Sequence, residues 1–238
     1  MPPIDRSVVA NLPSFAGLAP GELDEILREA RSIRYPKGAA VFAQGADADS
    51  FFALLHGHLR VVKTTPRGQQ IVVRYVSPGE IFGVAKALGL KAYPATAIAA
   101  VESVALCWRS VAWPRLTEKF PSLTANALRT VGQRLQETQA RVFEMSSEQI
   151  EQRIAHVLLR LAKQAGRKTQ AGIEIEFPVS RQNIAEMVGS TLHTVSRILS
   201  AWEQQDLIEG GRQRIVLRNP HKLLVLAERH ARSTVSSG

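Results

Sequence analysis

A regular apolar stripe after Pro121 constrains the fold of this chain more than any other feature. Its positions are spaced by 3, 4, 3, 4 and 3 residues, and they are Leu128, Val131, Leu135, Thr138, Val142 and Met145. This is an a/d heptad pattern with neither Gly nor Pro after Gly132, so it predicts one long helix with a narrow apolar seam. Such a seam packs either against its own domain or against a second copy in a parallel homodimer. Thr138, the one polar seam position, can tune stability or register.

The chain before this helix, from about residue 20 to 110, favours β-structure. The runs "AVFAQG", "SFFALLHGHLRVVKTTPRGQQIVVRYVSPGEIFG" and "TAIAAVESVALCWRS" are broken by Gly and Pro, which is typical of strands joined by tight turns. The glycines near expected turns, where a positive φ is easily reached, are Gly45, Gly57, Gly68, Gly79 and Gly83. The spacing predicts an antiparallel roll or barrel.

The chain from about residue 147 onward is expected to be helical and then briefly strand-like. "SEQIEQRIAHVLLRLAKQAG" predicts a helix that ends at Gly166, with one apolar face formed by Ile150, Ile154, Val157, Leu158 and Leu161. An alternating strand, "IEIEFPVS", and two short helices around Gly189 follow. The last stretch, "DLIEGGRQRIVLRN", alternates about a Gly-Gly turn and predicts a hairpin.

The two helices around Gly189 carry a pattern that is typical of a binding surface. Ser180 can cap the first helix, and Ser190 or Thr191 can cap the second. The positions expected to face inward are Ile184, Ala185 and Val188 on the first helix, and Val195, Leu199 and Trp202 on the second. The second helix is left with an outward face of Leu192, His193, Ser196 and Arg197.

These features fit a helix-turn-helix, whose second helix lies in the major groove of DNA. A generic helical hairpin with a solvated face is the alternative. The following hairpin favours DNA binding, because a winged arrangement puts Arg212 and Arg214 beside the phosphates. A polyanionic partner also suits the formal net charge of +9, although the basic excess is spread over the chain.

Membrane insertion and cysteine chemistry are not expected. No segment approaches the ~18 consecutive apolar residues that span a bilayer. The N-terminal "MPPIDRSVVANLPSF" lacks a basic region and a long apolar run, so no signal peptide is expected, and a cytoplasmic location is the default. Cys107 is the only cysteine, which excludes a disulfide within one chain and a cluster held by several thiolates; it is expected in a buried strand.

The stretch "VSRQNIAEMVGSTLHTVSRILSAWEQQDLIE" resembles the DNA-binding signature of the Crp/Fnr family of bacterial transcription regulators. "GHLRVVKTTPRGQQIVVRYVSPGEIFG" resembles the family's cyclic-nucleotide-binding-type β-roll, so the resemblance covers nearly the whole chain. It implies an α+β fold with a sensor β-roll domain and flanking helices over 1–120, a dimerisation helix over 121–146, and a winged helix-turn-helix over 147–238. "TLHTVSRILSAWEQQ" is most similar to the NnrR-type regulators of denitrification and nitric-oxide response.

The resemblance also implies partners and contacts. The expected partners are double-stranded DNA, a second copy of the chain and RNA polymerase, with two recognition helices ~34 Å apart. Arg197 is expected to bind guanine O6 and N7, and phosphate contacts are expected from Ser180, Arg181, Thr191 and Thr194. His193 replaces a position that is often glutamate, and Leu192 replaces an arginine of the cyclic-AMP-binding members, which suits an apolar contact to a thymine methyl.

The sensor region departs from the family patterns that bind known effectors. The members that bind cyclic AMP hold its phosphate with an Arg-Ser pair after a Gly-Glu pair; here Gly79 and Glu80 are followed by Tyr93 and Pro94 at the aligned positions, and Gln139 replaces a serine beside Thr138. The absence of that arginine argues against cyclic AMP, and one cysteine argues against an iron–sulfur cluster. The carbon-monoxide-sensing haem members bind the iron with a histidine or cysteine just after the "GEIF"-like turn. The residues at those positions here cannot bind haem iron in that way, since they are Gly83, Val84, Ala85 and Lys86.

Haem is left open by the sequence. His56 and His58 flank Gly57 in an expected turn, where two exposed histidines are the plain interpretation and a metal-binding pair is the alternative. No metal site is expected elsewhere.

The sequence therefore predicts a sequence-specific regulator, a homodimer on a palindromic site, that controls nitrogen-oxide genes in response to nitric oxide or low oxygen. The alternative is a related regulator that responds to another small molecule or is constitutively active, with the β-roll as a ligand-binding or structural module. An enzyme is not expected, because no P-loop, G-x-S-x-G or H-E-x-x-H motif occurs.

Overall fold

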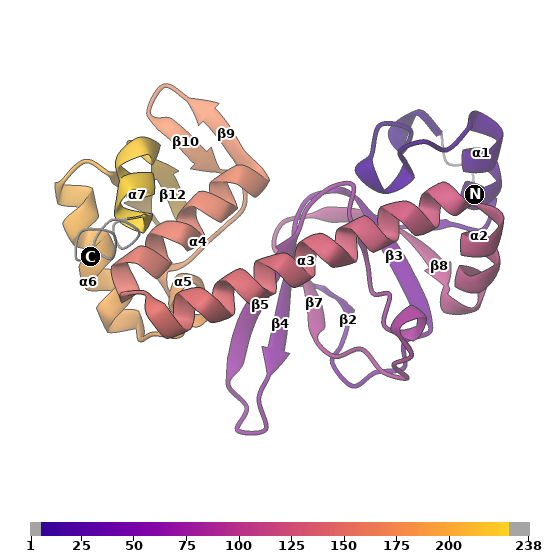
Figure 1. The fold of residues 1–238 in the computed structure, drawn as a ribbon, viewed down its shortest axis with the longest axis horizontal. Helices are drawn as coiled ribbons and strands as arrows, with labels where there is room; N and C mark the ends of the chain where they lie inside the picture. Colours follow the sequence, from indigo (N-terminus) through magenta and orange to yellow (C-terminus); the bar gives the residue numbers. More distant parts are fainter. Residues whose placement is uncertain (1–5, 229–238) are drawn as a thin grey trace, which may run out of the picture. The chain divides into compact units, whose positions relative to one another are not determined.

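The computed structural model describes residues 6–228 in two compact units, which divide between Gln136 and Glu137 within one long helix (Figure 1). Residues 1–5 and 229–238 lie outside the described residues. They are the first five residues of the N-terminal stretch in which no signal peptide is expected, and the last ten residues of the expected DNA-binding domain. None of the helices described is long and apolar enough to cross a membrane.

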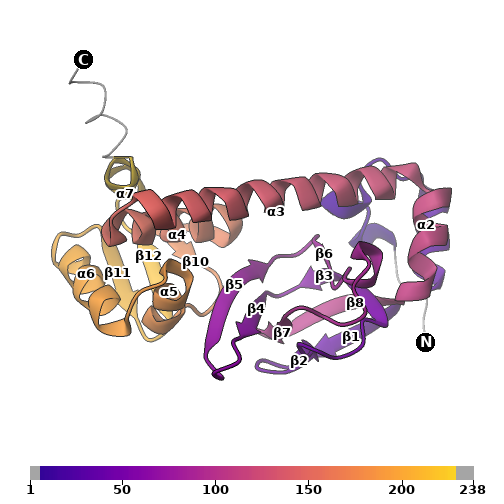
Figure 2. The same ribbon diagram turned by 60° about the horizontal axis from the view of Figure 1, so that its bottom comes forward.

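The N-terminal unit is an antiparallel β-roll with helices at its end, as expected (Figure 2). One sheet has the strand order β1-β8-β3-β6 and the other β2-β7-β4-β5. The strands are β1 (Arg31–Tyr35), β2 (Ala40–Phe42), β3 (Ser50–His56), β4 (Leu59–Thr64), β5 (Gln70–Val76), β6 (Ile81–Phe82), β7 (Thr96–Ala99) and β8 (Ser103–Arg109). The helices are α1 (Pro20–Arg28), α2 (Trp113–Lys119) and the first part of α3 (Pro121–Ser147), with short 3-10 turns at Arg6–Val8, Pro13–Phe15, Lys86–Leu88 and Ser110–Ala112.

Two apolar cores hold this unit together. The sheets enclose the first core, which includes Phe52, Leu54, Leu59 and Phe82. The second packs α1, α2 and the start of α3 against the outside of the roll. The Trp108 indole N–H donates to the Ile26 carbonyl at 2.9 Å and joins β8 to α1. Burial of such large side chains, at about 1.5–3 kcal/mol each, is the main stabilising term of the unit.

The expected tight turns are present. All five glycines of the expected turns have positive φ. Gly57, between β3 and β4, has φ +85°, and a β-carbon there would overlap the Glu102 carbonyl and Ser103. Only glycine combines that backbone conformation with that close approach.

The long helix α3 confirms the heptad prediction within one residue of its expected end. Its early turns are anchored to the unit by Leu123, which is buried, and by Asn126, whose side-chain amide donates to the carbonyls of Ser14 and Ala16. The apolar seam positions are exposed instead, from 40% at Val131 to 67% at Leu128. Within the described chain Leu135, Val142 and Met145 stay more than half exposed, whereas Leu128 and Val131, although exposed, also face the roll.

The C-terminal unit packs helices against a small antiparallel sheet of order β11-β12-β10-β9. Its elements after α3 are α4 (Ile150–Ala165), β9 (Gly166–Thr169), β10 (Gly172–Ile175), α5 (Arg181–Val188), α6 (Leu192–Gln204), β11 (Ile208–Gly211), β12 (Arg214–Leu217) and α7 (Pro220–Ala227). The predicted inner face of α4 is buried except for Ile150, which is half-buried. This confirms the helix that was expected to end at Gly166.

Two local expectations were wrong. The hairpin does not turn at Gly210-Gly211, which lie in β11; it turns at Arg212 and Gln213, and Gln213 has φ +62°. The strand expected over "IEIEFPVS" stops at Ile175, where its pairing with Gly166 at the start of β9 ends, and the strand β9 itself was not expected from the sequence.

Candidate nucleic-acid interface and effector pocket

The helix pair α5–α6 is joined by a sharp turn with a cap at each helix start. Ser180 Oγ accepts the Asn183 backbone N–H at 3.1 Å. Gly189 closes α5 in the left-handed conformation with φ +64°. Thr191 Oγ1 caps α6 by accepting the Thr194 N–H at 3.2 Å. Both predicted caps and the glycine turn are confirmed, and of the two candidates for the second cap, Thr191 is the one used.

The inner face of α6 is buried as expected. Val195 is fully buried, Leu199 and Trp202 are nearly so, and Ile198 joins them. They face a unit core to which α5 contributes Ile184, Ala185 and Val188, which are all buried. This packing fixes which side of α6 is presented to solvent.

The outer face of α6 is free of acidic residues from Thr191 to Trp202. Leu192, His193 and Arg197 are exposed, and Ser196 is partly covered. Among residues 6–228, Arg197 has no hydrogen-bond or ion-pair partner. The first turn of α6 also presents the positive end of the helix dipole. This face thus offers a cation, a hydroxyl and an imidazole, and α6 has no carboxylate before Glu203.

The arginines predicted to contact phosphates differ in whether they already bind a carboxylate. Arg212 lies exposed in the β11–β12 turn. Arg214 instead donates to Glu174 at 2.8 Å and to Glu209 at 2.6 Å. The hydrogen bonds from Arg214 are the main reason why the pKa values of Glu174 and Glu209 are lowered. In turn, the bond to Glu174 contributes most to raising the pKa of Arg214. Arg181 is also engaged, with its guanidinium directed at α6.

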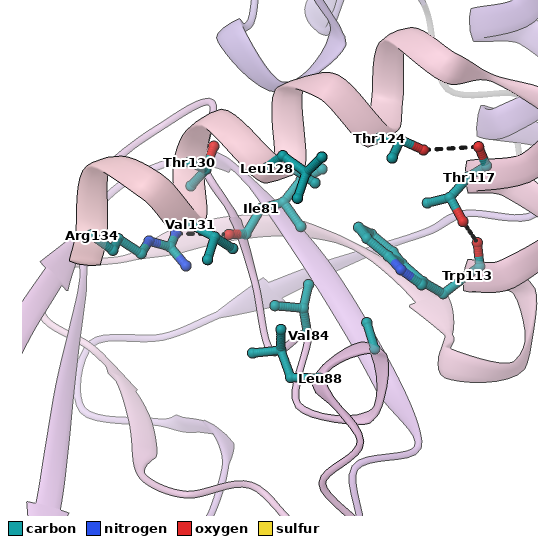
Figure 3. Close-up of a pocket in the computed structure, with 12 residues that line it drawn as sticks. Ile81, Val84, Leu88, Trp113, Thr117, Thr124, Leu128, Thr130, Val131 and Arg134 are labelled. Carbon is teal, nitrogen blue, oxygen red and sulfur yellow. Dashed lines mark hydrogen bonds between the residues drawn. The ribbon is translucent and has the colours of Figure 1, made fainter. Parts of the chain in front are cut away.

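A cavity of about 190 Å³ lies between the roll and α3 within the N-terminal unit (Figure 3). Ile81, Val84 and Leu88 form one wall, Leu128 and Val131 of α3 form another, and Trp113 of α2 closes one side. Arg134 contributes the charged end, while the hydroxyls of the lining threonines donate to backbone carbonyls, from Thr117 to Trp113, from Thr124 to Thr117 and from Thr130 to Asn126. Sequence analysis missed this cavity, because its residues come from three segments without a shared motif.

The Gly-Glu pair beside the cavity is already satisfied by the chain. Glu80 Oε2 accepts from Arg74 at 2.9 Å and from Arg134 at 3.0 Å, and Arg134 also donates to the Ile81 carbonyl. Tyr93, at the aligned position of the missing arginine, is buried, stacks on Phe42 and donates its hydroxyl to the Ser50 carbonyl. Its side chain is therefore not turned toward a phosphate.

The structure changes the interpretation of the histidine pair. His56 is exposed, but His58 is buried with only 8% exposure, so the expectation of two exposed turn histidines was wrong for His58. Cys107 in β8 is partly buried rather than buried. Within residues 6–228, no group of three histidine, cysteine or acidic side chains could hold a metal ion.

A β-roll followed by a capped helix pair and a hairpin defines a class of DNA-binding regulators with a sensor domain of the nucleotide-binding type. The family models agree: residues 32–120 match the cyclic nucleotide-binding domain, and residues 152–226 match the Crp-like helix-turn-helix domain. Together these matches cover more than half of the chain. The chain belongs to the Crp/Fnr family of transcription regulators.

Known relatives agree over most of their length. The chain is 28% identical over 199 residues to the cyclic AMP receptor protein of Thermus thermophilus, covering 84% of this chain and 89% of that protein. It is 26% identical over 208 residues to the transcriptional activator protein FnrA of Stutzerimonas stutzeri, covering 86% and 83%. These names describe regulators and not enzymes.

Solved structures share the fold. A CRP-family transcriptional regulator from Thermus thermophilus is 28% identical, with a TM-score of 0.70, over 82% of this chain and 96% of that one. FixK2 from Bradyrhizobium japonicum gives a TM-score of 0.71 at 22% identity, over 83% and 96%, which is a likeness of fold.

Proposed function

We propose that this protein binds a palindromic DNA site as a homodimer and regulates transcription through α6. The observation that carries the proposal is the exposed face formed by Leu192, His193 and Arg197, in a stretch of α6 without acidic residues up to Trp202, where Arg197 has no partner among the described residues. A rigid inner face and a cationic outer face are what a helix in the major groove requires. The exposed seam of α3 supports the dimer, because Leu135, Val142 and Met145 each remain more than half exposed within residues 6–228.

The proposed base contacts lie on the outer face of α6. Arg197 binds a guanine through two hydrogen bonds, Ser196 and His193 reach neighbouring base edges, and Leu192 contacts a thymine methyl. The proposed phosphate contacts come from the helix starts and the wing turn, which are Ser180, Thr191, Thr194 and Arg212. The capping hydroxyl of Ser180 accepts a backbone N–H and can still donate its own proton to a phosphate. The hydroxyls of Thr191 and Thr194 lie 3.0 Å apart in a hydrogen bond, so only one of the two can donate to a phosphate while that bond lasts. Arg181 and Arg214 could contact a phosphate only after releasing the carboxylates that they now bind.

A cytoplasmic location and RNA polymerase as a further partner are parts of the proposal that rest on the family resemblance. The same holds for control of nitrogen-oxide genes in response to nitric oxide or low oxygen, which depends on the likeness of "TLHTVSRILSAWEQQ" to the NnrR-type regulators.

The cavity beside α3 does not fit a haem. Its lining holds no histidine, cysteine, methionine or tyrosine for the iron, and its volume of about 190 Å³ is below the roughly 300–1,000 Å³ of typical ligand pockets. The observation favours a second candidate, a regulator that responds to a small apolar molecule. The absorption spectrum of protein mixed with haem, with and without nitric oxide, separates the two. An absorption band of protein-bound haem that shifts on adding nitric oxide would support a nitric-oxide sensor that uses haem. A spectrum identical to that of free haem would exclude haem-based sensing.

Cyclic AMP is not the proposed effector. The phosphate has no arginine at the Tyr93 position, and Glu80 is held by two internal arginines. Calorimetry with cyclic nucleotides is expected to show no micromolar binding, and a micromolar constant would overturn this part of the proposal.

Selection from random DNA tests the function itself. The full-length protein is expected to enrich a two-fold symmetric motif with half-sites one helical turn apart. Enrichment of no motif, or of a single half-site, would contradict the proposal.

A further inference from the structure

The side chain of Arg181 ties the start of α5 to the recognition helix α6. Its guanidinium donates to the Ser196 carbonyl at 3.2 Å and to Ser200 Oγ at 2.9 Å. It also donates to both carboxylate oxygens of Glu203, at 2.8 and 3.0 Å. The arginine therefore holds α6 at three successive turns of the same face.

The wing closes against the same group. Gly210 in β11 lies so near that a β-carbon there would overlap Glu203 Oε1. The Arg181–Glu203 pair consequently sits where α5, α6 and the wing meet. We call Arg181, Ser200 and Glu203 the α6 clamp.

The clamp competes with a phosphate contact. A phosphate that binds this guanidinium would have to displace the Glu203 carboxylate, or accept a negative charge within a few ångströms of its own. Arg212 carries no such partner among the described residues, so the chain offers the DNA backbone another cation at lower cost.

We infer that Arg181 is a positioning residue that sets the register of α6 in the groove, and not a phosphate contact. The inference rests on the proposed function, since it assumes that α6 reads DNA. The Ser196 carbonyl, which Arg181 holds, is on the residue adjacent to Arg197. Bidentate bonding to guanine tolerates little displacement, so loosening that turn weakens base discrimination first.

The experiment compares Arg181→Met, Glu203→Gln and the double variant in the full-length protein. Binding is measured on the selected operator and on random DNA over a series of salt concentrations. If the clamp sets the register, both single variants lose on the order of 10-fold in operator affinity, and the double variant loses no more than either. Binding to random DNA and its salt slope stay near those of the parent.

A phosphate role gives the opposite pattern. Arg181→Met would then reduce the salt slope on both DNAs by about one per protomer. Glu203→Gln would release the arginine and leave operator binding unchanged or tighter. That combination would overturn the inference, while a parent protein that prefers no sequence would overturn the proposed function instead.

Two controls keep the result interpretable. Arg181→Lys retains the charge but cannot make the four bonds, so under the clamp it fails to restore operator affinity. Arg218→Met removes an arginine that is paired with Asp206 and Glu209 and makes no bond to α6; it is expected to leave the operator preference unchanged. Thermal melting of each variant identifies any that fails to fold.

Discussion

Arg197 and His193 lie four residues apart on α6, and therefore one above the other on its exposed face. Both were expected on this face from the sequence, because the apolar positions of the helix leave only one side for solvent. Their partners could not be expected. That Arg197 has no partner among the described residues while Arg181 is held by Glu203 depends on how α5 crosses α6, and no local pattern encodes that crossing.

Replacing Arg197 by alanine is expected to cost roughly 1–3 kcal/mol in operator binding and to relax the preference at one base position. The reason is the loss of a bidentate contact with guanine. Binding measurements on the selected operator and on single-base variants of it provide the check. Arg31→Ala, an exposed arginine of β1 in the other unit, removes the same charge and should keep the preference. If Arg197→Ala bound the operator and random DNA with the same affinities as the parent protein, the assignment of α6 as the recognition helix would be contradicted.

His193→Glu is expected to change the selected base at the position that His193 faces. Glutamate accepts a hydrogen bond from cytosine N4, whereas histidine can donate. Repeating the DNA selection with the variant measures the change. An unchanged motif would mean that His193 does not contact a base.

At the scale of elements, the predictions succeeded where one period dominates. The 3-4 spacing predicted α3, and alternating runs between glycines predicted the roll. They failed where two short elements adjoin. β9 follows α4 directly, and the two-residue turn at Arg212–Gln213 competes with an adjacent Gly-Gly pair that is a stronger turn signal. Phe143, 68% exposed beside the seam position Val142, was missed because it falls outside the a/d pattern.

Leu135→Glu is expected to convert the protein from dimer to monomer at micromolar concentration. The substitution places like charges opposite each other in a parallel seam, where the leucine is 57% exposed in the single chain. Sedimentation velocity measures the change. Gln133→Glu adds the same charge on an exposed position outside the seam and should stay dimeric. If the parent protein is itself monomeric, the assignment of the seam as a dimer interface is contradicted.

The wing sheet is expected to lose stability in acid. Hydrogen bonds from Arg214 lower the pKa of Glu174 and Glu209 in the folded protein. A lowered carboxyl pKa stabilises the fold above the unfolded pKa of about 4.3, and the contribution is lost as the pH falls through the folded value. Denaturant unfolding followed between pH 7 and pH 3 tests this. Glu174→Gln should flatten the acidic limb of the profile, and an identical limb in the variant would contradict it.

At the scale of the whole molecule, the class followed from the sequence, because the β-roll and the helix pair each carry their own pattern. The effector did not. The cavity is built from the loop after β6, from α2 and from α3, which only the folded chain brings together. The net charge of +9 was equally uninformative about the location of the binding site, since the basic excess is spread over the chain and arginines such as Arg160, Arg181 and Arg214 are held in ion pairs.

The salt dependence of DNA binding is therefore expected to follow individual unpaired cations and not the net charge. Arg212→Ala should reduce the slope of log K against log salt by about one per protomer, because one phosphate contact is lost. Arg214→Ala, which removes a cation already held by two carboxylates, should leave the slope near that of the parent. Electrophoretic or fluorescence titrations at several salt concentrations measure both. Equal reductions in the two variants would show that Arg214 exchanges its carboxylates for phosphate.

The overlap between a β-carbon at Gly210 and the Glu203 carboxylate has an evolutionary consequence. Substitution at position 210 is expected to be coupled to Glu203, because a β-carbon there requires the carboxylate to shift from where it binds Arg181. Homologues that keep arginine and glutamate at 181 and 203 should keep glycine at 210, and those that abandon the pair should accept side chains there. A family alignment would then show positions 181, 203 and 210 changing together.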